Sequence, residues 1–550
     1  MTPLRTLLAG LALACLALAG CSADGGGPVA SSRSSAGAGG SGPEDAGAPS
    51  DAAVAEADAG LDAGARARCR KLDAAVGRAA LREHLERFEA IAKEHGGHRA
   101  TRSPGYAASL AYVRSSLEGA GLAPVEHRFD ILHFELLGPG TLEVLAPRRR
   151  VFRPVPDVAR GASWGGAEHV ALRGSPPGDV RAELVAVDYV PGQMDTTSGC
   201  EDADFVAPGG ASFVSGKIAL LGRGKCTFAD KVRRAEAAGA LAVVVANQGD
   251  AADRMALMAG DLVSEPADRR IAIPAVFTTS AVGRELVAAL ERGPVELHLV
   301  AHTEHRLEAD VSLLVEVAGH RRDEVLMAGA HLDSVKEGPG VNDNGTGSAA
   351  LLEIARALAG CTPERTVRLA WWGAEEPGLL GSDAYVAELG PAERRRVRAY
   401  VNLDMLGSVN HIFEIADGDG SKGKGRGPGT SAELERFFLD DFADAKLPVV
   451  ERPYHFRSDY RAFHRAGIGV GEVTTGADEK KGPAEVALFG GTMGRPDPCY
   501  HRPCDTVKNV DFDVYEAVAR SVARAVERFG VEGGGLVVVE PPDAGAADGG

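Results

Sequence analysis

The sequence predicts an α/β protein with a mainly parallel central sheet flanked by helices, and with a second, smaller α/β domain inserted into it. Three observations support this fold class. The chain has 550 residues, which is too long for one ordinary hydrophobic core. From about Leu313, short apolar runs alternate with helical patterns, as they do around parallel sheets. Residues 178–293 repeat this alternation by themselves and carry few candidate catalytic groups, which indicates a separate unit.

Three amphipathic helices frame the main domain. Apolar side chains recur with helical spacing over residues 81–92 and 106–117, and Ser103 opens the second of these helices. The same spacing over residues 514–529 predicts a closing helix.

Four apolar runs between these helices predict the strands of the main sheet, namely "SLLVEVAG", "EVLMAGAH", "TVRLAWWG" and "AYVNLDML". A helix is expected from Ser348, between the second and third runs. Sites in such folds form at the carboxyl ends of the strands. Most of the acidic or histidine-bearing motifs of this chain do follow a predicted strand.

The inserted segment has its own strand pattern. "GKIALLGRGKCTFADKVRRAEAAGALAVVVANQ" alternates strand, helix and strand, and "IAIPAVFTT" adds a further strand. We read this segment as a separate inserted domain in which binding or covering a site is a better expectation than catalysis.

The N-terminus has the layout of a secretory signal. One early charge, Arg5, precedes an apolar run that ends in small residues. The sequence "LAGC" at 18–21 resembles the lipobox of bacterial lipoproteins, in which case Cys21 is lipidated and provides the only attachment to a membrane. A plain secretion signal or a membrane span is the alternative, although the run is short for a span. We expect an exported protein, anchored by lipid to the bacterial cell envelope or released.

Composition completes the expected domain organisation. The segment after the signal is rich in Ala, Gly, Ser, Pro and Asp, and it has too few large apolar residues to fold. We expect six parts: a signal peptide at 1–20, a disordered linker at 21–65, the N-terminal part of the main domain at 66–150, the insert at 151–300, the rest of the main domain at 301–530, and a disordered tail at 531–550.

The net charge of -17 argues against nucleic acid or an anionic membrane surface as the main partner. A solvated acidic surface without a function is the alternative explanation of this charge.

Cysteine usage indicates disulfides. Of the eight cysteines, Cys15 and Cys21 belong to the signal region, and an even number remains in an exported chain. Cys499 and Cys504 are close enough to close a small loop, and Cys200 with Cys226 is a second candidate pair. By elimination, Cys69 is left to pair with Cys361.

The stretch "HLDSVKEGPGVNDNG" combines His331, Asp333 and Asp343. A histidine at the end of a strand can ligate zinc, and an aspartate two residues later can orient it. Asp343 lies in a glycine-rich turn that can project a carboxylate between two metals. An ordinary solvated turn is the alternative for this motif alone.

Three further motifs carry candidate functional residues. Glu375 and Glu376 in "WWGAEEPG" repel each other unless a cation or a proton compensates them. An exposed pair is the alternative, but the tryptophans before them disfavour a surface position. Asp404 in "NLDM" ends an apolar run, and His501 lies inside the expected Cys499–Cys504 loop.

Together these motifs supply nitrogen and oxygen ligands for two zinc ions: His331, Asp343, Glu376, Asp404 and His501. A mixed set of this kind favours zinc over calcium, which prefers oxygen alone. Asp343 would bridge the two ions, and Glu375 remains as a general base. Two neighbouring metals can share a hydroxide and clamp a carbonyl, an arrangement of aminopeptidases and phosphatases.

At this point a family resemblance is visible. Residues 313–530 resemble the secreted bacterial two-zinc aminopeptidases of the leucyl-aminopeptidase type, through the motifs "HLDS", "VNDNGTGSAALLE", "WWGAEE", "NLDM", "RSD" and "CYHRPCDT" in matching order and spacing. "GHRATRSPGYAASLAYV" resembles the start of the same domain, so the implied fold is that of the zinc exopeptidases. The insert resembles a protease-associated domain through "GCEDADF", "GKIALLGRGKCTFADKV" and "IPAVF".

The resemblance implies a role for each matching residue. His331 and Asp404 would hold one zinc and Glu376 and His501 the other, with Asp343 between them. Glu375 would take a proton from the metal-bridging water and pass it to the leaving amine. Tyr500 would hydrogen-bond the oxyanion, and Arg457 would help to hold the N-terminal end of the substrate. The implied substrates are peptides with a free N-terminus and, most simply, a hydrophobic first residue.

The chain departs from the family pattern next to Arg457, where Phe456 and Tyr460 replace a glycine and a histidine. His455 and His464 lie nearby without a motif, so we expect surface or packing roles for them. We find no clear counterpart of the calcium ligands that some relatives have. The competing interpretations are a two-zinc carboxypeptidase or dipeptidase on the same scaffold, a one-zinc glutaminyl cyclase, and a non-catalytic receptor. The complete ligand set disfavours the last two.

Overall fold

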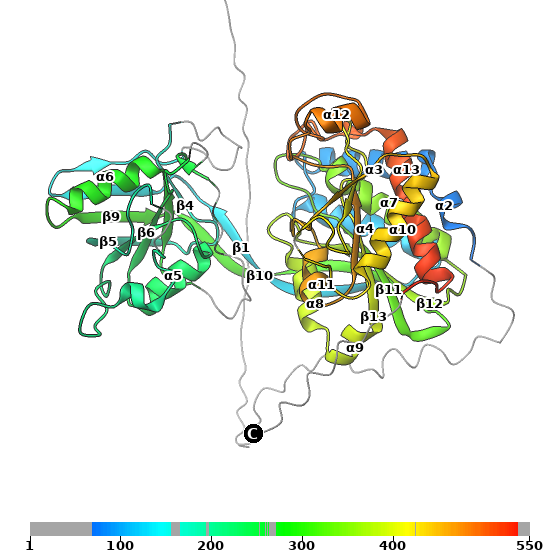
Figure 1. Cartoon of the computed structure of the whole chain (residues 1–550), viewed down its shortest axis with the longest axis horizontal. Helices are drawn as coiled ribbons and strands as arrows, with labels where there is room; N and C mark the ends of the chain where they lie inside the picture. The colour runs from blue at the N-terminus through cyan, green and yellow to red at the C-terminus, as the bar shows by residue number, and fades with distance from the viewer. Residues whose placement is uncertain are drawn as a thin grey trace, which may run out of the picture. The chain divides into compact units, whose positions relative to one another are not determined.

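Two eight-stranded sheets organise the chain in a computed structural model (Figure 1). The structure describes residues 69–155, 166–193, 197–251, 254–258, 260, 262, 271–423 and 425–536. The expected signal peptide, Cys21 and the linker lie outside these residues, as do residues 537–550 of the expected tail. Residues 531–536 of that tail are described, and Leu536 belongs to a hydrophobic core. Among the described residues, no helix is long and apolar enough to cross a membrane.

The main sheet is parallel at its centre and has antiparallel pairs on both sides of that centre. The neighbouring strands β12, β11, β13 and β16 run parallel to one another, whereas β1, β10 and β14 add antiparallel pairs. The predicted α/β class with a mainly parallel core is therefore confirmed. In order across the sheet, the strands are β1 Val125–Leu136, β10 Thr303–Val317, β12 Arg365–Trp372, β11 Arg321–His331, β13 Val397–Leu403, β16 Val470–Thr474, β14 Glu414–Ala416 and β15 Val450–Arg452.

The central strands are buried on both faces because alternate side chains point to opposite sides of the sheet. On β12, Trp371 contributes to one hydrophobic core and Trp372 to the other, and both are 0% exposed. On β11, Ala330 lies in the first core and Met327 in the second. A strand buried on both faces needs a nearly continuous apolar run, which is the pattern the sequence shows.

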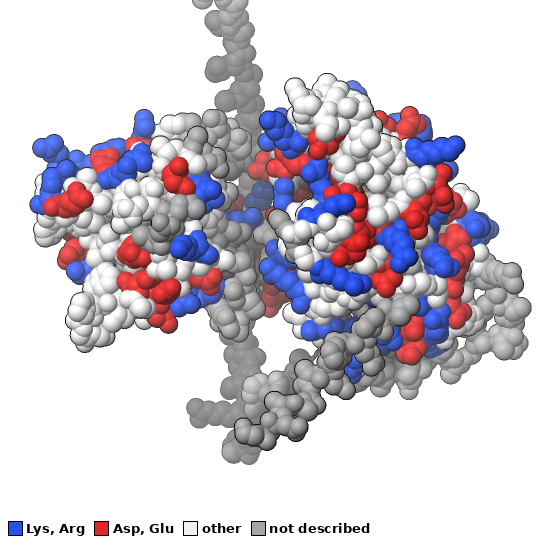
Figure 2. Space-filling view, viewed as in Figure 1, with Lys and Arg blue, Asp and Glu red and all other residues white. Residues whose placement is uncertain are grey.

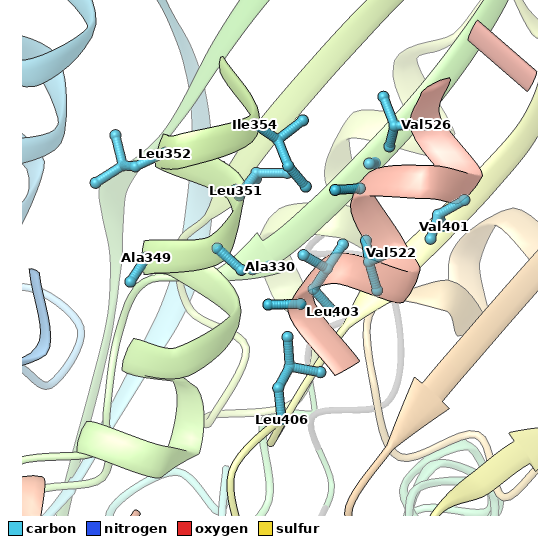
Figure 3. Packing of buried hydrophobic residues seen from close by; sticks show 14 of the residues in the cluster. Ala330, Ala349, Leu351, Leu352, Ile354, Val401, Leu403, Leu406, Val522 and Val526 are labelled. Atoms are coloured by element: carbon cyan, nitrogen blue, oxygen red, sulfur yellow. The ribbon is translucent and has the colours of Figure 1, made fainter. Parts of the chain in front are cut away.

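Helices α7 and α13 cover the first face. Leu351 and Ile354 of α7 and Val522 and Val526 of α13 belong to one core with the side chains of the central strands (Figure 3). The N-terminal helices add Leu85 and other apolar residues to this core, so the main domain includes segments from both sides of the insert. The helices that contribute to this core are α2 Leu72–Ala75, α3 Arg78–Glu94, α4 Pro104–Gly119, α7 Thr346–Leu358, α10 Ser431–Asp444 and α13 Phe512–Val526.

The second face is covered by shorter helices. Tyr385 of α8 (Leu380–Glu388) and Phe463 of α11 (Tyr460–Arg465) pack around Trp372. The remaining helices of this part are α9 Pro391–Arg396 and α12 Pro483–Phe489.

The second sheet is built from the insert and its flanking strands. Strands β5, β6, β7 and β8 pair in parallel, and β2, β4 and β9 add antiparallel pairs. Across this sheet the strands are β3 Arg150–Val151, β2 Thr141–Ala146, β9 Glu296–Ala301, β5 Gly178–Ala186, β6 Ile218–Gly222, β7 Ala242–Ala246, β8 Ala275–Thr278 and β4 His169–Ala171, with helices α5 Phe228–Ala237 and α6 Ser280–Leu290.

The chain leaves the main sheet through β1 and returns through β10. These strands pair antiparallel from Val125 opposite Leu314 to Leu136 opposite Thr303. The two ends of the insert therefore lie opposite each other on neighbouring strands.

Three disulfides join the described cysteines in the pairs that the sequence predicts: Cys69–Cys361, Cys200–Cys226 and Cys499–Cys504. Positive and negative side chains are mixed over the face seen in Figure 2, without a continuous basic surface there.

Candidate metal centre

Three adjacent parallel strands place three of the predicted ligands, His331, Glu376 and Asp404, at one edge of the main sheet. His331 is the last residue of β11 and lies opposite Trp372, the last residue of β12. Glu375 and Glu376 lie in the turn just after β12, and Asp404 directly follows the end of β13. Because parallel strands end at the same edge, motifs that are distant in sequence meet there.

Asp343 lies between the two predicted histidines. Its Oδ1 is 3.2 Å from Nε2 of His331, and its Oδ2 is 3.2 Å from Nε2 of His501. Each oxygen of this one carboxylate therefore faces a different imidazole, which is the placement expected of a ligand shared by two ions.

Each histidine has a further carboxylate beside it. Nε2 of His331 is 3.5 Å from Oδ1 of Asp404, and Nε2 of His501 is 3.1 Å from Oε2 of Glu376. The structure thus brings all five predicted ligands together in two overlapping groups: His331, Asp343 and Asp404, and Asp343, Glu376 and His501.

The donor set fits a pair of cations such as zinc. Oδ1 of Asp404 and Oε1 of Glu376 are buried without a hydrogen-bond partner, so each has an unused acceptor inside the cluster. Burial disfavours a charged ring at His501, yet hydrogen bonds with Asp343 and Glu376 raise its pKa to about 11. The carboxylates therefore stabilise a positive charge at this position. A bound metal ion can supply this charge, and the histidines then act as neutral ligands.

The turn that carries Asp343 is fixed by another aspartate. Oδ1 and Oδ2 of Asp505 accept the backbone N–H groups of Asn342 and Asp343 at 2.9 and 3.1 Å. Asn344 anchors the other side of the turn, since its side chain donates to the carbonyl of Leu403 at 2.8 Å. The carboxylate of Asp343 is therefore positioned by the segment that also carries His501.

Asp333 contacts His331, as its spacing predicts, but through its main chain rather than through its carboxylate. Nδ1 of His331 is 3.1 Å from the carbonyl oxygen of Asp333 but 3.8 Å from its carboxylate. The carboxylate instead accepts the backbone N–H groups of Glu375 and Glu376 at 3.1 and 3.2 Å. Asp333 thus orients the histidine through its main chain and the glutamate pair through its side chain.

Glu375 lies at the cluster without being in either ligand group. Its Oε2 is 4.0 Å from Nε2 of His331, and the residue is 8% exposed. Burial raises the pKa of Glu375 well above its ordinary value; the charge of His331 opposes this shift and that of Glu376 adds to it. A nearby cation would lower this pKa.

Tyr500 and Arg457 meet beside the cluster. An N–H of Arg457 donates to the hydroxyl of Tyr500 at 3.2 Å, and the Tyr500 ring stacks on His501 at 3.8 Å between centroids. Burial, with the charges of Asp343 and Glu376, raises the pKa of Tyr500 above its ordinary value, so its hydroxyl remains a donor. Asp478 holds the other end of the guanidinium at 2.8 Å.

Phe456 and Tyr460, the two residues that depart from the family pattern, differ in how far they are exposed. The hydroxyl of Tyr460 accepts the backbone N–H groups of His455 and Phe456 at 3.0 and 2.7 Å, and its side chain is fully buried. Tyr460 therefore supports the turn before Arg457, whereas Phe456 is 39% exposed.

The unassigned histidines have local partners. Nε2 of His455 lies 3.4 Å from Glu472, and the ring of His464 packs on those of Tyr454 and Phe456. Neither histidine belongs to the groups of described residues that could hold a metal ion.

Several residues that support the centre were not predicted from the sequence. The hydroxyl of Ser458 donates to Asp404 at 2.6 Å, and Asp505 and Asp478 act as described above. Ser458 and Asp505 lie inside the motifs "RSD" and "CYHRPCDT", which was the available signal. Asp478 lies in no such motif.

The fold and the site define a hydrolase that acts on peptide bonds, as the sequence predicts. Residues 312–526 match the model of peptidase family M28, and residues 180–286 match that of the PA domain. The chain belongs to peptidase family M28 and has a PA domain ahead of the residues that match this family. The expected family and the expected protease-associated insert are thus confirmed.

Curated relatives cover most of the chain. It is 39% identical over 443 residues to an "Aminopeptidase" of Pseudomonas aeruginosa (strain UCBPP-PA14), covering 80% of this chain and 78% of the relative. It is 35% identical over 470 residues to the "Probable lipoprotein aminopeptidase LpqL" of Mycobacterium tuberculosis, covering 83% and 85%.

Solved structures share the fold. The aminopeptidase from Aneurinibacillus sp. strain AM-1 superposes with a TM-score of 0.63 at 24% identity, covering 86% of this chain and 98% of that one. The Bacillus subtilis zinc aminopeptidase BSAP gives 0.53 at 23% identity, covering 84% and 98%.

Proposed function

We propose that the chain is a zinc-dependent aminopeptidase that removes N-terminal, preferentially hydrophobic, residues from peptides. The observation that carries the proposal is the position of Asp343. One of its carboxylate oxygens lies 3.2 Å from His331 and the other lies 3.2 Å from His501. A site for a single ion has no need of this arrangement.

Two zinc ions are assigned to the two groups of ligands. His331 and Asp404 would hold one ion, Glu376 and His501 the other, and Asp343 both. When bound, such a pair supplies an activated water and polarises the scissile carbonyl.

The remaining residues handle the proton and the charge that develops. Glu375, buried at the edge of the cluster, takes a proton from the attacking water and delivers it to the leaving amine. The protonated hydroxyl of Tyr500 donates to the oxyanion, and Arg457 fixes that hydroxyl and the N-terminal part of the substrate.

Recognition of a free α-amine follows from the acidic surroundings. The carboxylates of Glu375 and Asp404 lie 4.0 and 3.5 Å from Nε2 of His331 and can accept an ammonium group. The names of the relatives from Pseudomonas aeruginosa and Mycobacterium tuberculosis support an aminopeptidase.

Export and a lipid anchor at Cys21 belong to the same proposal. The lipobox-like "LAGC" and the disulfides support export, and the name of the mycobacterial relative supports a lipoprotein.

The direct test compares leucine anilide with its N-acetylated form, with the metal content of the protein determined in parallel. Cleavage of the free amine alone, with about two zinc ions per chain, is the expected result. Equal cleavage of both substrates contradicts recognition of the amine. Bound metal without cleavage of either substrate favours the carboxypeptidase or dipeptidase alternative.

A further inference from the structure

A second group of acidic side chains lies away from the zinc ligands. Asp417 follows the short strand β14, Asp419 is two residues later, and Glu435 is on helix α10. One carboxylate oxygen from each of the three lies within 4.8 Å of the others. Asp417 and Glu435 are only 1% and 2% exposed, whereas Asp419 is exposed.

Hydrogen bonds fix the three carboxylates but leave acceptor capacity unused. Asp417 accepts the backbone N–H groups of Gly420 and Lys422, at 2.9 and 2.8 Å, one on each oxygen. Oε2 of Glu435 accepts the backbone N–H of Asp419 at 2.8 Å. A carboxylate oxygen has two lone pairs, so each of these oxygens can take a further partner.

The independent observation is the other oxygen of Glu435. Oε1 is buried and has no hydrogen-bond partner, although the side chain lies among two other carboxylates. A buried carboxylate oxygen that is left unpaired costs folding free energy unless something balances it. The amine of Lys422 pairs with Glu451 at 3.0 Å, a residue outside the group of three.

We infer that Asp417, Asp419 and Glu435 form a calcium site. The donors are oxygens only, and hard cations such as calcium prefer such a set, whereas zinc prefers sites with nitrogen or sulfur. Because Asp417 lies at the end of β14 and Glu435 on α10, a bound ion would link the edge of the main sheet to this helix. The site would stabilise the fold rather than take part in turnover.

The test uses the zinc-loaded full chain in calcium-free buffer, with calcium chloride as the probe. Calorimetry should show one site with a dissociation constant of about 0.1–1 mM, the range of extracellular calcium modules, and the midpoint of thermal unfolding should rise with calcium. Magnesium should bind more weakly, because it requires stricter octahedral geometry.

Three variants make the test specific. Glu435→Gln and Asp419→Asn should each weaken calcium binding at least about tenfold, and Asp419 is exposed, so its replacement leaves the core intact. Asp440→Asn, an exposed change on the same helix, is the matched control and should bind as the parent does. Without calcium, Glu435→Gln should unfold at or above the temperature of the parent, and this order should reverse when calcium is added.

Two results would overturn the inference. One is the absence of any calorimetric signal or change in unfolding midpoint at about 10 mM calcium, well above the expected dissociation constant. The other is equal calcium affinity in the parent, Glu435→Gln and Asp419→Asn, which would place the ion elsewhere.

Discussion

At the scale of single residues, the metal centre is a set of buried charges that compensate one another only in part. Asp404 and Glu376 each keep one buried oxygen without a hydrogen bond. His331 and Glu375 are buried in the same cluster. Such a cluster is costly to fold without cations, so binding of metal and stability of the folded chain should be linked.

Replacing Glu375 by glutamine should separate metal binding from catalysis. The amide keeps the size of the side chain but cannot take a proton, so kcat should fall by at least about a hundredfold. The zinc content should stay unchanged because Glu375 is in neither group of ligands. Metal analysis and kinetics on one preparation check both statements. Asp440→Asn serves as an exposed control, and full turnover in Glu375→Gln would remove this residue from the mechanism.

Asp478→Asn should weaken the hold on Arg457 by a modest amount. The two side chains are 34% and 52% exposed, so their ion pair contributes about 0.2–1 kcal/mol. That range corresponds to a fall of up to about fivefold in kcat/KM, with zinc retained. Glu516 lies on α13 and pairs with Arg78, so Glu516→Gln removes a comparable exposed ion pair and is the matched control. A loss of zinc in Asp478→Asn would mean that the residue supports the fold instead.

Motifs predicted the charged residues of the candidate metal centre. They did not predict all of the residues that hold these side chains in position. The five predicted ligands follow strands or turns that are recognisable in the sequence. Asp478 reaches Arg457 across 21 residues of chain, and only the path of the loop brings the two together. Asp333 shows a related limit, because spacing alone could not tell whether its main chain or its side chain holds His331.

At the scale of elements, the join between the metal-binding turn and helix α7 leaves no room for a larger side chain. A Cβ added at Gly347 would meet the carbonyl oxygen of Leu403 and the side chain of Asn344. Gly347→Ala should therefore displace the turn that carries Asp343, lower the free energy of unfolding by about 1–3 kcal/mol and weaken zinc binding.

Gly119→Ala gives the contrasting case. Nothing lies within 4 Å of a Cβ at this position, and the residue ends helix α4. Alanine there should leave zinc binding unchanged and raise stability by up to about 1 kcal/mol. Thermal unfolding and metal titration of the two variants check the pair, and equal behaviour would contradict close packing at Gly347.

Hydrophobic patterning predicted the strands and the long helices of the main domain. The runs "EVLMAGAH" and "TVRLAWWG" became neighbouring parallel strands, and residues 514–529 fall in α13 and the turn after it. The edge strands β14 and β15 were not predicted, because each is only three residues long and such short runs carry no clear period.

At the scale of the whole molecule, one disulfide ties the start of the described chain to the end of helix α7. Cys69 and Cys361 are separated by 292 residues, compared with 5 for Cys499 and Cys504. Because a longer loop loses more entropy when it is closed in the unfolded state, replacing Cys69 and Cys361 by serine should cost about 2–5 kcal/mol.

Denaturant unfolding of the double variant checks this value. The Cys499→Ser/Cys504→Ser variant should lose less stability by this mechanism, but it should bind zinc more weakly because His501 lies in that small loop. Equal losses of stability in the two double variants would contradict a stabilisation that grows with the length of the closed loop. The pairing of Cys69 with Cys361 could be predicted only by elimination, since local sequence does not indicate a contact over such a separation.

Strands β1 and β10 have a consequence for the history of the protein. Leu136 and Thr303 are direct partners on these strands, so the chain departs from the main sheet and comes back at almost the same point. An ancestral gene could therefore have gained the intervening segment in a single event at the tip of a hairpin, without rerouting any other connection. By the same reasoning, that segment can diverge, be exchanged or be deleted in descendants while the catalytic part of the gene evolves under its own constraints.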